Sequence, residues 1–274
     1  MMRRVAILGE RGSFHEEAAL AFYKEDRLSI IGFDSFEQML LAYHSCLADA
    51  VVIAVENTLS GGLIKNLELL HARSSPIVGE VYIPIHQCLM ALPGQQLKDI
   101  REVRSHEMAL DQTNLFFKEE CPWIKCVRAS STVAAVKEVS EGKLLGVGAV
   151  ASRLAAQIYG LEILSADIES FKENYTRFFI VDRDYKLEEA DKATWCFTLP
   201  HKSGALAQIL TILSFYDMNL TRIQSLPIPG HPWEYFFYAD IQFSDYTRYD
   251  QALSAVRPLI ADLDIMGIYK GMLG

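Results

Sequence analysis

Short apolar runs alternate with amphipathic stretches along the first two thirds of the chain. A run such as Val51–Val55, rich in β-branched residues, is typical of a strand buried on both faces. The pattern predicts strands near 5–8, 51–55, 77–83, 86–92, 101–104, 125–128 and 144–148, and helices near 16–23, 63–71, 107–118, 132–141 and 149–158. Strands that alternate with helices in this way indicate an open α/β sheet.

The pattern changes in the last third. Residues 182–192 are dense in charge and lack apolar periodicity, which predicts a domain boundary. After them the expected elements are a strand at 194–199, a helix at 204–216, strands at 219–227 and 233–243, a helix at 246–261 and a strand at 264–269. This order is βαββαβ, the ferredoxin-like plan.

Composition narrows the class of protein. With 274 residues, half of them apolar, the chain can form about two domains with cores. A net charge of −9 argues against a nucleic-acid partner. The five cysteines lack disulfide or zinc spacing, so no metal is expected. No apolar stretch reaches membrane-spanning length and the start resembles no signal peptide, so we expect no membrane partner and a cytoplasmic protein.

Hydroxyl and amide side chains follow several predicted strands. They are Glu56-Asn57-Thr58, Ser105-His106, Ser130-Ser131-Thr132 and Ala151-Ser152. In an open parallel sheet these strand ends and the following helix N-termini face one crevice, where free N–H groups can hold an anion. Each side chain taken alone is more typical of an ordinary helix cap than of a ligand contact.

A further polar cluster, Asn174-Tyr175-Thr176-Arg177-Phe178, opens an apolar run. Alternation places Asn174, Thr176 and Phe178 on one face of the strand and Arg177 on the other. Polar groups at the mouth of a buried strand require a ligand or one another, although a strand-end turn also explains Asn and Thr. The chain has no phosphate-binding glycine motif, no Gly-x-Ser-x-Gly and no metal spacing. These features favour a neutral, polar pocket for a carboxylate, with no cofactor.

Taken in order, these motifs resemble those of the prephenate dehydratase family over nearly the whole chain. The matching stretches are Gly9–Phe14, Glu56–Thr58 with Gly61, Ser105–Gln112, Ser131-Thr132, Gly148–Ser152, Tyr159–Leu161 and Asn174–Phe178. The resemblance implies decarboxylating dehydration of prephenate to phenylpyruvate in phenylalanine biosynthesis.

The resemblance also implies roles for residues of the catalytic part. Thr176 is the expected proton donor to the departing hydroxyl. Asn57, Ser105, Gln112 and Thr132 orient the substrate carboxylates. Arg177 neutralises charge or braces the neighbouring loop, and Glu56 is expected to brace Arg177 or a helix end. In this chain Thr58 stands for the family's usual Ser, and Ser13-Phe14-His15 stands for Thr-Phe-Ser.

The last third resembles an ACT domain, the amino-acid-sensing module that follows the catalytic part in this family. The resemblance implies that phenylalanine, as an allosteric effector, binds at Gly204, Ala205, Leu206, Asn219, Leu220 and Ser225. Three positions depart from the family: Leu226 stands for its regulatory Arg, Gln224 for Glu and Ser203 for Pro. The coupling between effector and catalysis is therefore expected to differ.

The implied architecture is a two-lobed catalytic part like a type II periplasmic binding protein, plus the ACT domain. Residues 1–183 form the catalytic domain, with lobe 1 at about 1–83 and 162–183 and lobe 2 at about 84–161. Residues 184–193 form a linker and 194–274 the ACT domain, in a homodimer or homotetramer. Two alternatives stay open: an arogenate dehydratase, and a non-catalytic binding or regulatory protein that uses the same pocket.

Overall fold

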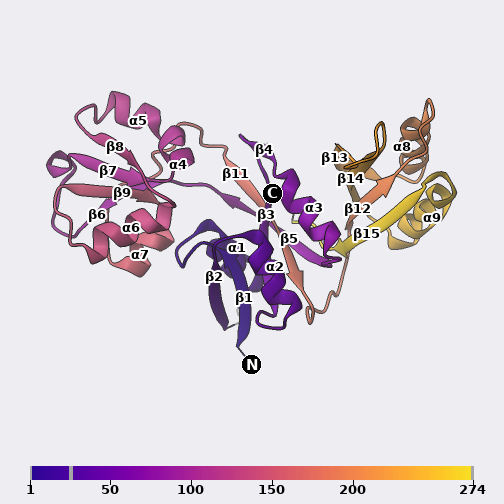
Figure 1. The fold of residues 1–274 in the computed structure, drawn as a ribbon, viewed down its shortest axis with the longest axis horizontal. Coiled ribbons are helices and arrows are strands. Elements are labelled where there is room, and N and C mark those ends of the chain that lie inside the picture. The colour runs from indigo at the N-terminus through magenta and orange to yellow at the C-terminus, as the bar shows by residue number, and fades with distance from the viewer. Residues whose placement is uncertain (1, 25–26, 273–274) are drawn as a thin grey trace. The chain divides into compact units, whose positions relative to one another are not determined.

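A computed structural model describes residues 2–24 and 27–272, and its chain forms three β-sheets covered by helices (Figure 1). The chain divides into two compact units, Met1–Asn66 with Val81–Phe178, and Leu67–Glu80 with Phe179–Gly274. The first unit holds most of the strands of the first sheet and the whole of the second. The second unit holds the third sheet.

The first sheet has the strand order β2-β1-β3-β11-β5, with β4 paired to β3. Strand β1 runs parallel to both β2 and β3. Its strands are β1 (Arg3–Leu8), β2 (Leu28–Phe33), β3 (Ala50–Asn57), β4 (Gly61–Gly62), β5 (Ile77–Pro84) and β11 (Tyr175–Asp182). The associated helices are α1 (Phe14–Tyr23), α2 (Phe36–His44) and α3 (Ile64–Ala72). Residues Ala50–Val55 of β3 are all buried, as expected of a strand covered on both faces.

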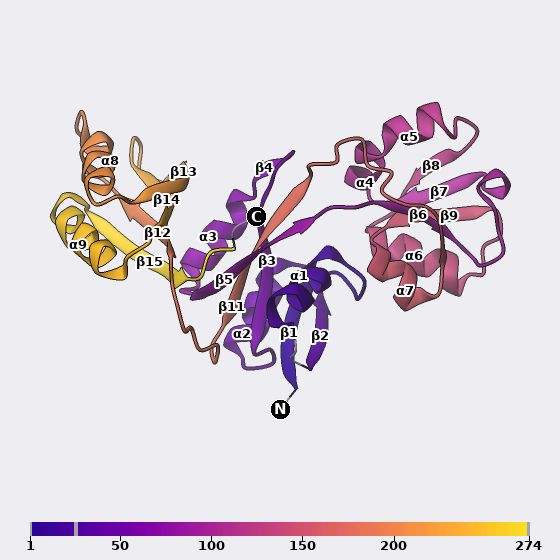
Figure 2. The ribbon, with the colours of Figure 1, turned by 180° about the vertical axis from the view of Figure 1, so that it is seen from behind.

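The second sheet has the order β10-β6-β9-β7-β8. Its strands are β6 (Cys88–Ala91), β7 (Glu102–Ser105), β8 (Lys125–Arg128), β9 (Val147–Ala151) and β10 (Glu162–Ser165). Its helices are α4 (Glu107–Gln112), α5 (Asn114–Glu119), α6 (Thr132–Glu141) and α7 (Arg153–Tyr159), with a short 3₁₀ helix, η1 (Leu97–Asp99). Helices α6 and α7 cover one face of this sheet, and α4 and α5 cover the other (Figures 1 and 2).

Alternation along β6 explains this packing on both faces. Cys88 and Met90 contact the cluster that contains α6 and α7, whereas Leu89 and Ala91 belong to the cluster that contains α4 and α5. Successive side chains of a strand point to opposite faces, so an unbroken apolar run supplies two cores at once.

Three predicted elements of the first unit differ from the structure. The strand predicted at 144–148 is β9, at Val147–Ala151, because residues 144–146 form a turn and Gly146 has a φ of +72°. The helix expected from 149 accordingly begins only at Arg153, where the Ser152 hydroxyl accepts the Ala155 N–H. The single helix predicted at 107–118 is two helices that meet at Thr113, the C-cap of α4 and the N-cap of α5. The Thr113 hydroxyl donates to the Ala109 carbonyl in the last turn of α4.

Two connections join the first and second sheets. One runs from β5 to β6 through residues 85–87, and the other runs from β10 to β11 through residues 166–174. The connections are hydrogen-bonded to each other, because Ile85 N–H donates to the Asn174 carbonyl (2.8 Å) and Ile168 N–H donates to the Gln87 carbonyl (2.9 Å).

In the second unit, the third sheet has the antiparallel order β13-β14-β12-β15. Its elements are β12 (Lys192–Thr198), α8 (Ala205–Phe215), β13 (Asn219–Pro227), β14 (Tyr235–Gln242), α9 (Tyr246–Val256), the 3₁₀ helix η2 (Arg257–Leu259) and β15 (Asp262–Tyr269). The order is the predicted βαββαβ. Its core contains Trp195, whose ring N–H donates to the Tyr249 hydroxyl (2.8 Å), so the polar end of the buried indole is satisfied.

Candidate active site

The first unit contains a cavity of about 340 Å³. Its walls come from strand ends and helix starts of the first and second sheets. The lining residues are Leu8, Gly9, Glu10, Ser13, Phe14, His15, Ala54, Asn57, Ser60, Leu63, Ile85, Gln87, His106, Met108, Ala109, Gln112, Ser131, Thr132, Val133, Thr176 and Phe178. Among the described residues, no lysine or arginine lines the cavity. A bound anion must therefore be held by neutral donors and helix ends.

Strand β11 contributes one face to this cavity. Thr176 and Phe178 line it, whereas the intervening Arg177 does not. This is the alternation expected along residues 174–178. The Arg177 side chain is buried at 2% exposure, with Nη1 3.5 Å from Glu56 Oε2 and the guanidinium over the Tyr82 ring. Arg177 and Glu56 therefore meet each other outside the cavity.

The Asn57 amide is the centre of the hydrogen bonds at the mouth of β11. Its Nδ2 donates to Asn174 Oδ1 (2.8 Å), to Thr176 Oγ1 (3.0 Å) and to the Tyr175 carbonyl (3.2 Å). Its Oδ1 accepts the N–H groups of Leu59 and Ser60. Because Thr176 Oγ1 accepts from Asn57, the hydroxyl keeps its own hydrogen for a ligand in the cavity.

Two of the remaining predicted residues line the cavity and one does not. Gln112 and Thr132 are in the wall, and Gln112 Oε1 accepts from Gln87 Nε2 (3.1 Å). Ser105 lies outside the lining: it is fully buried, and its hydroxyl donates to the Val150 carbonyl (2.6 Å). Of the seven residues predicted for catalysis, the structure brings Asn57, Gln112, Thr132 and Thr176 together around one space.

The starts of two longer helices also face this space. Ser13 caps α1 by accepting the Glu16 N–H, and Ser131 caps α6 by accepting the Ala134 N–H. Both serines line the cavity. The two N-terminal dipole ends add favourable potential for an anion. Glu10 opposes this, but its carboxylate is 2.5 Å from Lys137 Nζ, which offsets its charge.

A prephenate dehydratase family model matches residues 5–186. The chain belongs to the prephenate dehydratase family. "Arogenate dehydratase/prephenate dehydratase 1, chloroplastic" of Arabidopsis thaliana is 31% identical to it over 97% of this chain and 71% of that protein.

Two solved structures resemble the whole fold of this prephenate dehydratase family member. A prephenate dehydratase from Arthrobacter aurescens in complex with L-Phe is 30% identical, covers 97% of this chain and 89% of its own, and has a TM-score of 0.85. A protein described as "GqqA- a novel type of quorum quenching acylases" is 28% identical over 98% of both chains, with a TM-score of 0.88. In the described part of the chain, no helix has the length and apolar character required to span a membrane.

In the C-terminal domain the structure separates the predicted effector residues into two groups. Gly204 precedes α8 with a φ of +78°, and the next residues, Ala205 and Leu206, line a cavity of about 160 Å³. Aromatic side chains of the β13–β14 hairpin complete that cavity, namely Trp233, Tyr235 and Phe237. Asn219, Leu220 and Ser225 lie on β13, outside this cavity, and β13 is an edge strand.

The structure adds cavity residues that motif reasoning had not placed there. Gln87 was missed because it lies inside a predicted apolar strand, and only the structure shows that it belongs to the connection between two sheets. His15 was noted as a family departure at the rim of the pocket, and the structure places it in the cavity lining. Its ring packs edge-on against Phe178 (4.9 Å between centroids), and its Nε2 is buried without a partner among the described residues. Desolvation by burial lowers the pKa of His15 to about 3, so the ring is neutral near pH 7.

Proposed function

We propose that this protein converts prephenate to phenylpyruvate, carbon dioxide and water. The carbon–carboxylate bond breaks, its electron pair enters the ring, and the ring hydroxyl leaves with one proton taken up from solvent. Aromatisation supplies the driving force, so the protein must chiefly orient the dianion and assist the hydroxyl. The supporting observation is the Asn57–Thr176 hydrogen bond, which leaves the Thr176 proton available in a cavity of neutral donors.

Thr176 is accordingly proposed as the proton donor to the leaving hydroxyl. A neutral hydroxyl is a weak acid, so its effect is a hydrogen bond that strengthens as negative charge develops on the departing oxygen. Asn57 holds Thr176 in place, and Gln112 and Thr132 orient the carboxylates. Arg177 and Glu56 brace the mouth of β11 from outside the cavity. Ser105 acts through the β7–α4 junction that it anchors to Val150.

The test is phenylpyruvate formation by wild type, Thr176→Val and Thr176→Ser. Removing the hydroxyl with an isosteric side chain should lower kcat by about a hundredfold or more, as for other single transition-state donors. The Ser variant keeps the hydroxyl and should retain most activity. Equal rates for Val and wild type would reject the role of Thr176, and no turnover by wild type would reject the reaction.

Arogenate is a second candidate substrate, which differs from prephenate by an amino group in place of the keto oxygen. The Arabidopsis relative, whose name contains both activities, favours testing it. The same preparation should be supplied with arogenate, with phenylalanine as the measured product. The ratio of the two kcat/KM values decides the preference. A non-catalytic binding protein would bind both compounds and consume neither.

The acylase named for one structural neighbour needs an activated nucleophile. Three serines line this cavity, Ser13, Ser60 and Ser131, and among the described contacts none has its hydroxyl bonded to a histidine; Ser13 and Ser131 cap their own helices. A dehydratase requires no such nucleophile, so the cavity favours the dehydratase.

We also propose the domain plan expected from the sequence: a two-lobed catalytic domain at 1–183, a linker at 184–193 and an ACT domain at 194–274. Its support is the βαββαβ order of the third sheet together with the αL glycine before α8. The relative solved with L-Phe favours phenylalanine as the effector. The exposed edge strand β13 would pair with a second copy in a homodimer or homotetramer.

A further inference from the structure

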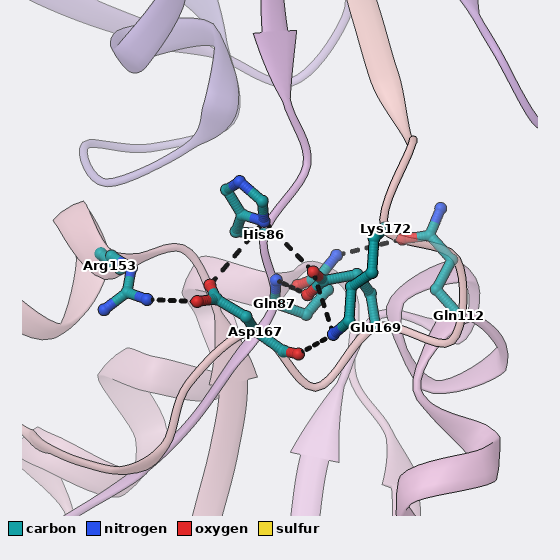
Figure 3. Close-up of polar contacts among 7 residues, drawn as sticks. All are labelled: His86, Gln87, Gln112, Arg153, Asp167, Glu169 and Lys172. Carbon is teal, nitrogen blue, oxygen red and sulfur yellow. Dashed lines mark hydrogen bonds and ion pairs between the residues drawn. The ribbon is translucent and has the colours of Figure 1, made fainter.

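A buried carboxylate, Glu169, lies on the connection between β10 and β11 and has no part in the chemistry described above. Its side chain is 1% exposed. Its Oε2 accepts the backbone N–H of Gln87 (2.9 Å), and its Oε1 lies 3.1 Å from His86 Nδ1 (Figure 3). Glu169 thus ties together the two connections that join the first and second sheets.

His86, Asp167 and Glu169 offer ligand atoms within 4.8 Å of one another, a set that could in principle hold a metal ion. The charges around them favour another role. Arg153 Nη2 is 2.7 Å from Asp167 Oδ2, and Lys172 Nζ is 3.5 Å from Glu169 Oε1. Two cations already lie beside the two carboxylates, so an added dication would meet positive charge. The cluster is therefore a structural ion-pair network.

Gln87 connects this network to the cavity, because its backbone N–H donates to Glu169 and the residue also lines the cavity. Gln87 is 2% exposed, and its Nε2 donates to Gln112 Oε1 (3.1 Å). The neighbouring connection supports the same pair, because Ser170 N–H donates to the Gln112 carbonyl (2.7 Å). Figure 3 shows the path from Glu169 through Gln87 to Gln112.

In this arrangement the bond from Gln87 Nε2 sets which end of the Gln112 amide faces a ligand, while the Gln87 Oε1 is buried without a partner among the described residues. A side-chain amide carries an acceptor oxygen and a donor NH₂, and a flip exchanges them. Because Gln87 engages Gln112 Oε1, the Gln112 NH₂ is left to face the cavity. A dianion is attracted by that NH₂ and repelled by the oxygen, so the orientation determines whether Gln112 helps or hinders binding.

We propose that Glu169 and Gln87 are positioning residues that hold the Gln112 amide with its NH₂ toward the substrate carboxylate. The inference rests on the proposed function for the identity of the dianion. Glu169 fixes the Gln87 backbone, Gln87 fixes the Gln112 oxygen, and Gln112 contacts the substrate. The relay acts on a contact made in the bound substrate as well as in the transition state, so its loss raises KM more than it lowers kcat.

The kinetic test uses Gln87→Met, which keeps the length of the side chain and removes the amide. One hydrogen bond to a charged group accounts for a change of about tenfold, so kcat/KM should fall about tenfold, mainly through KM. The same substitution in a Gln112→Ala background should cost little more, since the group being positioned is gone. Full additivity of the two substitutions overturns the proposal.

Glu169→Leu tests the first step of the relay and should reproduce the Gln87→Met effect. If it does not fold, Glu169→Gln keeps an acceptor for the Gln87 N–H and should retain most activity, while Gln87→Met continues to test the relay. Glu162→Gln is the matched control. Glu162 also accepts a backbone N–H, from Gly94 (3.0 Å), but it does not line the cavity and should leave KM unchanged.

A spectroscopic readout separates this inference from the proposed reaction. In the full chain labelled with [¹⁵N]glutamine, Gln87→Met should shift the Gln112 side-chain NH₂ signals, whether or not prephenate is consumed. Glu162→Gln should not shift them. A Gln112 signal unaffected by Gln87→Met overturns the relay even in an active enzyme. A shifted signal in a protein inactive on prephenate supports the relay and rejects the reaction.

Discussion

The side chains at the mouth of β11 illustrate what a residue type contributes and what its neighbours contribute. A threonine is an ordinary strand residue until an amide supplies a donor to its oxygen. Asn57 does this across 119 positions of sequence. The alternation of Thr176 and Arg177 was predictable from a period of two. The pairing of Thr176 with Asn57 had no geometric basis in the sequence, because that contact depends on the order of strands in the sheet.

His15 gives a prediction at the same scale. Part of the residue remains exposed, but Nε2, a site that would carry the added proton, is buried between apolar neighbours. The folded pKa is lowered from 6.5 to about 3, so the unfolded state binds more protons below pH 6.5. Stability contributed by neutral His15 is complete above pH 6.5 and is lost progressively as pH falls toward 3. Between pH 7.5 and 5 the loss should be about 2 kcal/mol.

Urea unfolding of wild type and His15→Phe at pH 7.5 and pH 5 checks this expectation. The variant keeps an aromatic ring against Phe178 and should lose less stability on acidification than wild type, by about 2 kcal/mol. The exposed His201→Gln is the control and should retain the wild-type pH dependence. Identical pH dependence in wild type and His15→Phe would show that the ring is not held neutral.

At the scale of elements, the loop between β1 and α1 packs directly on α7, at both its start and its end. Ser152 Oγ donates to the Gly12 carbonyl (2.7 Å), and Tyr159 OH donates to the Arg11 carbonyl (3.1 Å). Gly12 has a φ of +92°, and a Cβ there would lie 2.9 Å from Ala155 Cα. The glycine is therefore required both by its backbone conformation and by the close approach of a helix.

Gly12→Ala should separate the β1–α1 loop from α7 and disturb both walls of the cavity. We expect kcat/KM to fall about ten- to hundredfold, since misplacement of about 1 Å can have that effect. Gly160→Ala is the control, because Gly160 also has a positive φ (+65°) but a methyl group added there would meet nothing within 4 Å. Both variants should lose about 1–2 kcal/mol of stability from backbone strain, and only Gly12→Ala should lose activity as well. Comparable kinetics for the two would contradict the role of the contact.

The order of elements was largely predictable, because apolar runs and caps are local signals. Some differences arose where a single side chain decides a boundary, as Thr113 does between α4 and α5. Others were elements that the pattern did not predict, namely β2, α2 and β10. The candidate site was harder to predict. Ser105 follows a strand as a cavity residue should, yet its hydroxyl turns to Val150. Gln87 gives no local signal, since its importance comes from contacts with Gln112 and Glu169, 25 and 82 positions away.

At the scale of the whole molecule, the second unit carries its own core and its own small cavity beside α8. The positive φ of Gly204 places the start of α8 where its N–H groups can bind a carboxylate, and the aromatic residues of the β13–β14 hairpin offer an apolar wall. These features fit an amino acid with an aromatic side chain. Leu226 pairs with Phe236 in the sheet, and the sequence resemblance leads us to expect it in place of the family's regulatory arginine.

Phenylalanine should bind this domain, raise Tm and lower dehydratase activity. Inhibition requires that it bind an inactive state more tightly than an active one, and the rise in Tm reports binding to the folded protein alone. Measuring both separates binding from coupling, which the loss of the arginine at position 226 would weaken. Gly204→Val should abolish both responses, because a β-branched residue disfavours the αL conformation. Gly230→Val places the same β-branched residue at a positive φ (+81°) in the β13–β14 turn and should keep both. A Tm that rises without inhibition would leave the domain a sensor whose coupling Leu226→Arg should strengthen, whereas no change in either would reject phenylalanine as the effector.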